Sequence, residues 1–349
     1  MKWPMVKLNA ICRPKQWKTI SSSNLLDHGF PVYGANGQIG FYSEYTHEKP
    51  TLMITCRGAT CGSLNISVPK SYINGNAMAL DSLDTEKVDI MFLYYFLKQR
   101  GFQDVISGSA QPQITGQGLN KIEVPLPPLE EQKRIVAILD KADTIHQKRQ
   151  QAIALADDFL RSVFLDMFGD PVTNPKGCKL LPMTEVFHIK TGKLNSNAEV
   201  KSGVYPFFTC AKEVYRIDHY AFDQEALLLA GNNAQADYDV KHYIGKFNAY
   251  QRTYVLSLKN ENWSYPFFKF ALEFQLSNLK NSSKGSNTKY ITMEIMSRTM
   301  LPSPSPSEQS EFATYFKQQM DMRNILDKSQ QESNALFNSL SQKAFSGQL

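Results

Sequence analysis

Two groups of amide and guanidinium side chains lie in polar stretches that follow short apolar segments. In the first half, Arg57 follows the apolar segment 51–56, and Gln111 and Gln113 lie in the glycine-rich stretch 108–118. The second half offers Asn232, Asn233, Gln235, Gln251 and Arg252. A guanidinium fork fits a guanine edge, and a side-chain amide fits an adenine edge. These residues predict readout of DNA bases, and the alternative for each is an exposed polar side chain without a ligand.

Three lysines in the same neighbourhoods suit a different contact. Lys121 follows the first glycine-rich stretch, and Lys284 and Lys289 lie in its counterpart, residues 283–292. An ammonium group on a flexible stem attracts the DNA backbone but distinguishes bases poorly. We therefore predict that these lysines contact phosphates.

The sequence lacks the motifs of common catalytic and cofactor sites. There is no P-loop, no His-Glu-x-x-His and no glycine fingerprint of a dinucleotide fold. Cys56 and Cys61 have no second cysteine pair to complete a zinc site. Glu199-Val-Lys201 matches only the last part of a nuclease motif, and no well-placed aspartate precedes it. We expect neither a catalytic residue nor a metal or cofactor on this chain.

The residues that could read bases need a scaffold, and residues 1–123 predict a β-rich one. Glycines alternate with aromatic residues in 30–42, a pattern typical of short strands joined by tight turns. Residues 51–56 predict a buried strand, and residues 91–100 a helix that packs on the sheet. Residues 179–301 repeat this plan with different residues in the loops.

A long helix follows the first β-rich segment. Pro125, Pro127 and Pro128 prevent a helix before residue 129, and Glu130 and Glu131 suit the first turn of one. Apolar residues then recur at alternating spacings of three and four, interrupted only by Arg149. Gly169 and Pro171 end the pattern. About 40 residues at about 1.5 Å each make a rod of about 60 Å, and its period near 3.5 favours pairing with another helix.

The same construction returns 177 positions later. Pro125 and Gln132 are answered by Pro302 and Gln309, and residues 305–308 read as a capping box. The shared offset predicts an internal duplication in which the two helices pair. The predicted seam contains Ile135, Ile138, Ile145, Phe159, Val163, Phe312, Met322, Leu326, Leu336 and Leu340.

The segment Pro125-Leu-Pro-Pro-Leu-Glu-Glu-Gln132, the following Lys133-Arg-Ile-Val-Ala-Ile-Leu139 and the tail Ala344-Phe-Ser-Gly347 resemble the specificity subunit of type I restriction–modification systems. The second helix start departs from the motif, because Ser310-Glu-Phe-Ala313 replaces Lys-Arg-Ile-Val. The resemblance covers the whole chain. It implies an α+β fold with two β-rich target-recognition domains joined by two long helices, which form an antiparallel coiled coil with a pseudo-twofold repeat.

The expected boundaries are a first target-recognition domain at 1–125, a spacer helix at 126–170, a second domain at 171–302 and a second spacer helix at 303–349. The resemblance further implies double-stranded DNA as ligand, two methylation subunits and restriction subunits as partners. S-adenosylmethionine, ATP and magnesium are then expected only on those partner subunits.

Charge is unequally divided along the chain. Residues 1–128 carry 12 Lys/Arg against 9 Asp/Glu and residues 171–305 carry 16 against 11, whereas both helical segments are net negative. This division suits two domains that approach a polyanion. The sequence contains no apolar stretch of membrane length and no signal peptide at its N-terminus, and its five cysteines suit a reducing cytoplasm.

Two alternatives from other classes stay open. The chain could be a DNA-modifying enzyme of an unrecognised type, either a nuclease or a methyltransferase, which activity of the purified chain would reveal. It could also be a coiled-coil scaffold that binds only protein, which would have no salt-dependent affinity for DNA.

Overall fold

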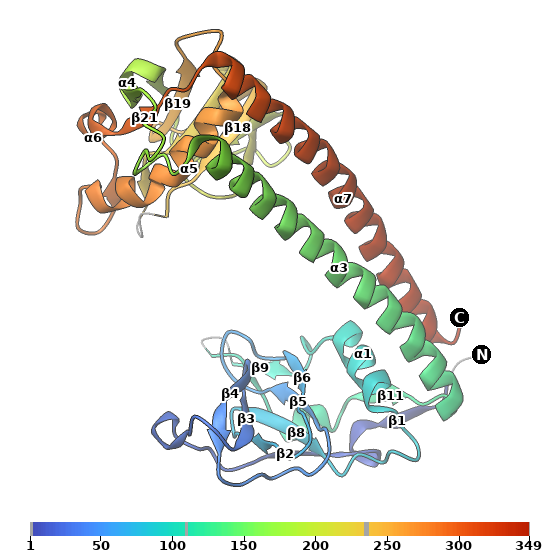
Figure 1. Cartoon of the computed structure of the whole chain (residues 1–349). Coiled ribbons are helices and arrows are strands. Elements are labelled where there is room, and N and C mark those ends of the chain that lie inside the picture. Colours follow the sequence, from blue (N-terminus) through green and yellow to red (C-terminus); the bar gives the residue numbers. More distant parts are fainter. Residues whose placement is uncertain (1–2, 109–110, 234–236, 349) are drawn as a thin grey trace. The chain divides into compact units, whose positions relative to one another are not determined.

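The computed structural model describes residues 3–108, 111–233 and 237–348, which form two compact units (Figure 1). The first unit contains Met1–Gln150 and Lys328–Leu349, and the second contains Gln151–Asp327. Each unit combines one β-rich segment with parts of both long helices.

The described residues of the first unit form four small sheets. Its strands are β1 (Met5–Lys7), β2 (Arg13–Gln16), β3 (Phe30–Gly34), β4 (Gly37–Tyr42), β5 (Leu52–Thr55), β6 (Leu64–Ile66), β7 (Tyr72–Ile73), β8 (Ala77–Asp81), β9 (Ile106–Ser107), β10 (Gln113–Ile114) and β11 (Glu123–Pro125). The sheet orders are β2-β8-β5-β6, β4-β3-β7, β10-β9 and β1-β11. Its helices are α1 (Ile90–Arg100), α2 (Gly116–Leu119), the first part of α3 (Leu129–Phe168) and the last part of α7 (Pro306–Ser346), with 3-10 turns at Leu8–Ala10 and Ser22–Asn24.

The core of the first unit lies between the four-stranded sheet and α1. Every residue of β5 is buried, as expected for the central strand of a sheet that is covered on both faces. Asp89 caps α1 by accepting hydrogen bonds from the amides of Met91 and Phe92. Ile135 and Leu139 of α3 and Ala344 of α7 complete this core. The strand at 52–55 and the helix at 90–100 confirm the sequence prediction.

The second unit has a larger sheet. Its strands are β12 (Leu180–Pro182), β13 (Phe187–Thr191), β14 (Tyr205–Phe208), β15 (Tyr215–Ile217), β16 (Phe222–Ala230), β17 (Asn232–Asn233), β18 (Val240–Ala249), β19 (Thr253–Leu258), β20 (Lys289–Tyr290) and β21 (Met300–Pro302). They form the sheets β13-β19-β16-β18-β14-β15, β12-β21 and β17-β20. The helices are α4 (Met183–Val186), α5 (Tyr265–Ser282), α6 (Met293–Arg298) and the remaining parts of α3 and α7, with a 3-10 turn at Ser196–Ala198.

Aromatic side chains dominate the core of the second unit. The buried ring of Phe164, on α3, stacks against Phe267, Phe270 and Phe274 of α5 at centroid distances of 5.4, 5.7 and 5.5 Å. Phe312 of α7 meets Phe164 edge-on at 5.2 Å. Burying several such rings supplies much of the stabilisation of a domain core.

Both long helices begin where the proline and capping-box residues predict, three residues inside the expected spacer segments 126–170 and 303–349, and α3 ends before Gly169 as predicted. α3 starts at Leu129, directly after the prolines, and Gly169 follows its last residue with a left-handed φ of 73°. α7 starts at Pro306, and the Ser305 amide donates to the Glu308 carboxylate at 2.9 Å, as a capping box requires.

The two helices pack antiparallel within each unit, but the seam differs in part from the prediction. In the first unit Ile135 is buried and Arg149 donates to the Ser329 carbonyl at 2.9 Å, which explains the polar residue in the apolar stripe. His146 Nδ1 lies 2.9 Å from Asn334 Oδ1. In the second unit Phe312 is fully buried, and Val163 packs against the same core.

Four of the predicted seam residues are exposed, so they are not buried between the two long helices. Ile145, Phe159, Met322 and Leu336 keep 40, 48, 52 and 60% of their surface accessible. A stripe drawn at 3.5 residues per turn drifts around a helix of 3.6 residues per turn. Leu160 is the buried neighbour of Phe159, and Ile138, Leu326 and Leu340 are half-buried.

No helix in the described part of the chain is both long and apolar enough to span a bilayer.

Candidate nucleic-acid interface

In the first unit the structure brings Arg57 and Gln113 together, although 56 positions separate them in the sequence. They form an antiparallel bridge, continued by hydrogen bonds from the Gly58 amide to the Pro112 carbonyl at 3.2 Å and from the Ile114 amide to the Cys56 carbonyl at 3.0 Å. Arg57 is exposed and Gln113 is half-exposed. The backbone bridge thus places Arg57 directly opposite Gln113.

The segment around Gln113 is more ordered than the loop that its composition predicts. Gln113 pairs with Ser107 on β9, and Thr115 caps α2 by accepting from the Gly118 amide at 3.1 Å. Gln111 is exposed at the edge of this ribbon. A two-stranded ribbon is narrow enough to enter the major groove of DNA.

The second unit repeats this ladder with other side chains. Asn232 pairs with Tyr290 and Asn233 with Lys289, and the Ile291 amide donates to the Gly231 carbonyl at 2.9 Å. The last bond corresponds to the one between Ile114 and Cys56. Asn232 and Tyr290 therefore occupy the backbone positions of Arg57 and Gln113, so the two units present different donors and acceptors on one scaffold.

Sequence reasoning missed Tyr290, a residue that is 40% exposed. The signal was available, because Tyr290 lies 177 positions after Gln113, the offset that relates the two long helices. An exposed tyrosine at this position offers a hydroxyl and a stacking face.

Gln251 and Arg252 lie beside the ladder of the second unit. The Arg252 carbonyl accepts from the Gly231 amide at 2.8 Å, directly before Asn232. The Gln251 side chain donates to Asn195 at 2.9 Å, and both residues are exposed. Gln235 lies outside the described residues.

The three predicted phosphate-contacting lysines have unequal surroundings. Lys121 is exposed in the turn before β11, and Lys289 is half-buried on β20. Lys284 is exposed but forms an ion pair with Glu294 at 2.8 Å, and Arg298 approaches the same carboxylate at 2.9 Å. The bond from Lys284 holds the pKa of Glu294 below its usual range, helped by the charge of Arg298.

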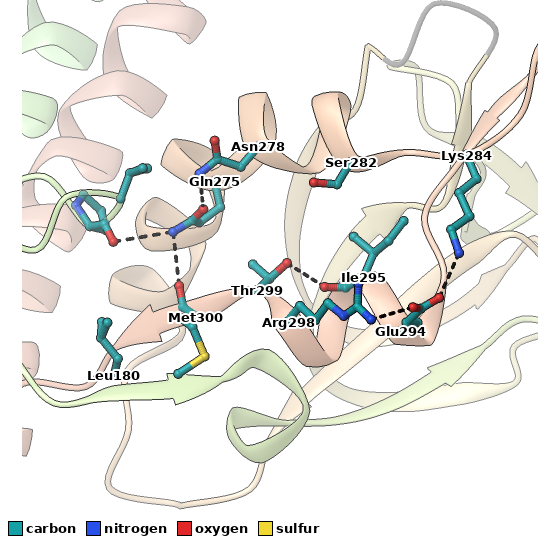
Figure 2. A pocket seen from close by; sticks show the side chains of 12 residues that line it. Leu180, Gln275, Asn278, Ser282, Lys284, Glu294, Ile295, Arg298, Thr299 and Met300 are labelled. Atoms are coloured by element: carbon teal, nitrogen blue, oxygen red, sulfur yellow. Dashed lines mark hydrogen bonds and ion pairs between the residues drawn. The ribbon is translucent and has the colours of Figure 1, made fainter.

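Figure 2 shows this cluster of three charged side chains beside a cavity of 360 Å³. At the other end of the cavity Gln275 donates to the Met300 carbonyl at 3.1 Å. Glu294 neutralises part of the charge of Lys284. Lys289 and Lys121 therefore have more charge available for a phosphate than Lys284 has.

A buried glutamine joins each long helix to the helix of its β-rich segment. Gln132 is fully buried, accepts from the Asp89 amide at 2.8 Å and donates to the carbonyls of Lys87 and Pro127, each at 2.8 Å. Gln309 accepts from the Ser264 amide at 3.0 Å and donates to the Pro304 carbonyl at 3.0 Å. Asp89 and Ser264 are the N-caps of α1 and α5. These bonds explain the glutamine of the proline–Glu-Gln motif.

The described residues contain no group of three side chains that could hold a metal ion. What the structure offers chemically is a pair of ladders carrying hydrogen-bonding side chains, each in a β-rich segment that is joined to a long helix.

The comparisons with known proteins agree with this arrangement. The family described as type I restriction modification DNA specificity domain matches residues 1–155 and 175–335. The specificity subunit of the type I restriction enzyme EcoDI of Escherichia coli is 39% identical over 142 residues, which are 40% of this chain and 30% of that subunit. A putative type I specificity subunit of Mycoplasma pneumoniae is 23% identical over 318 residues, 86% of this chain and 84% of the relative.

A solved structure shares the fold over almost the whole chain. The crystal structure of the S subunit of a type I restriction–modification system from M. genitalium has a TM-score of 0.68 at 16% identity and covers 99% of this chain and 96% of its own. A chain from a structure that describes complex assembly and conformational transition of the type I restriction–modification system has a TM-score of 0.54 at 14% identity, covering 100% of this chain and 98% of its own.

Proposed function

The chain belongs to the family of type I restriction–modification DNA specificity domains, and from this premise we propose that it selects the DNA target on which partner subunits act. Each unit reads one half of a split, asymmetric target in double-stranded DNA. The chain contributes binding and no chemical step of its own.

The observation that carries this proposal is the repeated ladder with different side chains. Arg57 beside Gln113 suits a guanine next to an adenine, whereas Asn232 beside Tyr290 suits an adenine with a neighbouring stacked or hydroxyl-bonded group. Two readers of different chemistry on one backbone are what an asymmetric target requires.

We further propose that two methylation subunits bind this chain and transfer a methyl group from S-adenosylmethionine to adenine N6. Restriction subunits that use ATP and magnesium would cut the unmodified target. The two helix starts are anchored in the same way by Gln132 and Gln309, which supports one docking position for each of two methylation subunits. We place the assembly in the cytoplasm, where the free thiols of the five cysteines persist.

The test is to co-express the chain with its methylation subunits and to map methylated adenines by sequencing. We expect a motif of two short specified halves separated by unspecified base pairs. Replacing residues 1–125 with those of a relative keeps the β1–β11 pairing within the exchanged part and should change one half only. A contiguous motif, or a change in both halves, would contradict reading by separate units.

The same preparation separates the alternatives. Methylation or cleavage by the purified chain alone would favour a DNA-modifying enzyme. A chain that binds the partner subunits but has no affinity for duplex DNA would favour a protein scaffold.

A further inference from the structure

A pair of lysines recurs on the first strand of the main sheet in both units. Lys15 and Lys18 lie at and just after the end of β2, and Lys190 and Lys193 lie 175 positions later, at β13. All four residues are exposed. The spacing of three residues is the same in both pairs.

Strand register shows that the two pairs are equivalent. Lys15 pairs with Ala79, which pairs with Met53 on the central strand β5. Lys190 pairs with Val255, which pairs with Leu228 on the central strand β16. The first lysine of each pair therefore lies on the strand two places from the central strand. Lys15 and Lys190 occupy the same position along their sheets.

These strands run beside the residues predicted to read bases. In the first unit Gln16 donates to the sulfur of Cys56, the residue before Arg57, at 3.0 Å. In the second unit Leu194, next to Lys193, accepts from the Gln251 amide at 2.9 Å. Each lysine pair is thus tied through its neighbouring residue to the reading segment of its own unit.

Close approach of the backbone is found beside the lysines in both units. A Cβ added at Gly192 would lie 1.8 Å from the Ala249 carbonyl oxygen, so this position accepts only glycine. A Cβ added at Gly75 would lie 2.6 Å from the Trp17 carbonyl oxygen. The lysine-bearing segment is therefore in contact with the segment at Gly75 in the first unit and with the segment at Ala249 in the second.

In the second unit the lysines border a cavity suited to an anion. The cavity has a volume of 720 Å³ and is lined by Lys190, Lys193 and His219 beside the apolar surfaces of Phe222 and Met293, and none of the described residues that line it is Asp or Glu. Tyr254, also in its wall, donates its hydroxyl to the Ile291 carbonyl of the reading ladder at 2.7 Å. In the described part of the chain neither lysine forms an ion pair.

The first unit arranges its pair differently. The Lys15 ammonium lies 3.6 Å from the centre of the Trp17 ring, and the Trp17 indole donates to Asp81 at 3.1 Å. The ring holds Lys15 in place without neutralising it.

We propose that Lys15 and Lys18 in one unit, and Lys190 and Lys193 in the other, bind DNA backbone phosphates beside the bases that each unit reads. This inference rests on the proposed function and adds the phosphodiester contacts that orient the reading ladders. The cavity of the second unit receives phosphate oxygens and has no role in base selection.

The test measures how the affinity of the full-length chain for a 40-base-pair duplex of arbitrary sequence depends on salt. Each phosphate contact contributes about 0.9 to the slope of log K against log salt. Lys190→Gln with Lys193→Gln should therefore lower the slope by about two and weaken specific and arbitrary duplexes by the same factor. The matched control is Lys179→Gln with Lys201→Gln, which removes two exposed lysines from the same unit.

Four outcomes decide the proposal. A normal slope in Lys190→Arg with Lys193→Arg supports a contact through charge. An equal loss of slope in the Lys179/Lys201 control would overturn the proposal, because the net charge of the unit would then explain the effect. No loss in the Lys190/Lys193 variant would overturn it while leaving target selection intact. Absence of duplex binding by the unchanged protein would instead refute the proposed function.

A further arm distinguishes DNA phosphate from free phosphate. Calorimetric titration of the unchanged chain with inorganic pyrophosphate should give no binding at millimolar concentration. Tight binding of pyrophosphate that the Lys190/Lys193 variant loses would assign the site to a free phosphate ligand and overturn the DNA contact.

Discussion

The side-chain oxygen of Gln132 accepts a hydrogen bond from the backbone amide of Asp89 at 2.8 Å, and this bond joins the start of one helix to the start of another. Gln132 lies in the first turn of α3, and Asp89 caps α1. Gln309 and Ser264 repeat the relationship at 3.0 Å. Each β-rich segment is thus attached to its long helix through a buried polar contact as well as through apolar packing.

Gln132→Ala should destabilise the first unit. The substitution leaves the Asp89 amide and the Lys87 and Pro127 carbonyls without their partner, and each unsatisfied buried group costs about 1–3 kcal/mol. Scanning calorimetry should show a lower melting temperature, and hydrogen exchange should accelerate at residues 89–92. Gln150→Ala, an exposed position on the same helix, is the control. Equal melting of both variants would show that the buried bonds contribute nothing.

Arg57 should contribute base selection through its planar fork. Arg57→Ala should cost about 1–3 kcal/mol on the true target and relax one position of the methylated motif. Arg57→Lys keeps the charge but loses the two-point contact, so it should retain affinity for arbitrary DNA and still lose selectivity. Methylome sequencing and titration of both duplexes measure this. An equal loss on the specific and the arbitrary duplex would remove Arg57 from base readout.

Lys289 should matter more than Lys284 for attraction to the backbone. Lys289→Gln should lower the salt slope by about one, whereas Lys284→Gln should lower it by less because Glu294 already neutralises part of that charge. Glu294→Gln should raise the slope. Titration at several salt concentrations measures all three variants. A larger effect of Lys284→Gln than of Lys289→Gln would contradict the importance of the ion pair.

The start of α7 should lose stability in acid. Hydrogen bonds from the Ser305 hydroxyl and amide hold the pKa of Glu308 below its usual value. Because the folded pKa is lowered, the stabilisation is complete above the unfolded pKa and disappears as pH falls through the folded pKa. Glu308→Gln should therefore lower stability at pH 7 by about 0.3–1 kcal/mol. The difference from the unchanged protein should vanish at low pH, and Glu311→Gln, one turn on, is the control.

The elements whose ends are set by proline or glycine could be predicted from the sequence. The prolines before Leu129 and the glycine after Phe168 fix the ends of α3, because neither residue type continues a helix there. The duplication was visible through the shared offset of proline and glutamine. Positions within the helix seam were less predictable, because Arg149 is satisfied by a carbonyl of the other helix, which no periodicity can reveal.

The candidate site was predictable as a set of residues but not as a geometry. Nothing local indicates that Arg57 bridges to Gln113, because sheet pairing depends on the whole unit. The lysine pairs escaped notice for a related reason. Their offset of 175 differs from that of the helices, and only strand register makes Lys15 and Lys190 equivalent.

The glycines at the chain crossing limit how such a gene can be rearranged. Gly75 and Gly192 make the same chain crossing possible, but they lie on opposite segments of it. The glycine is therefore on the second segment in the first unit and on the first segment in the second unit. A hybrid that joined the first segment of one unit to the second segment of the other would bring together either two glycines or none. Recombination between the two halves of the gene should therefore preserve only whole domains, and descendants should inherit each domain as a block.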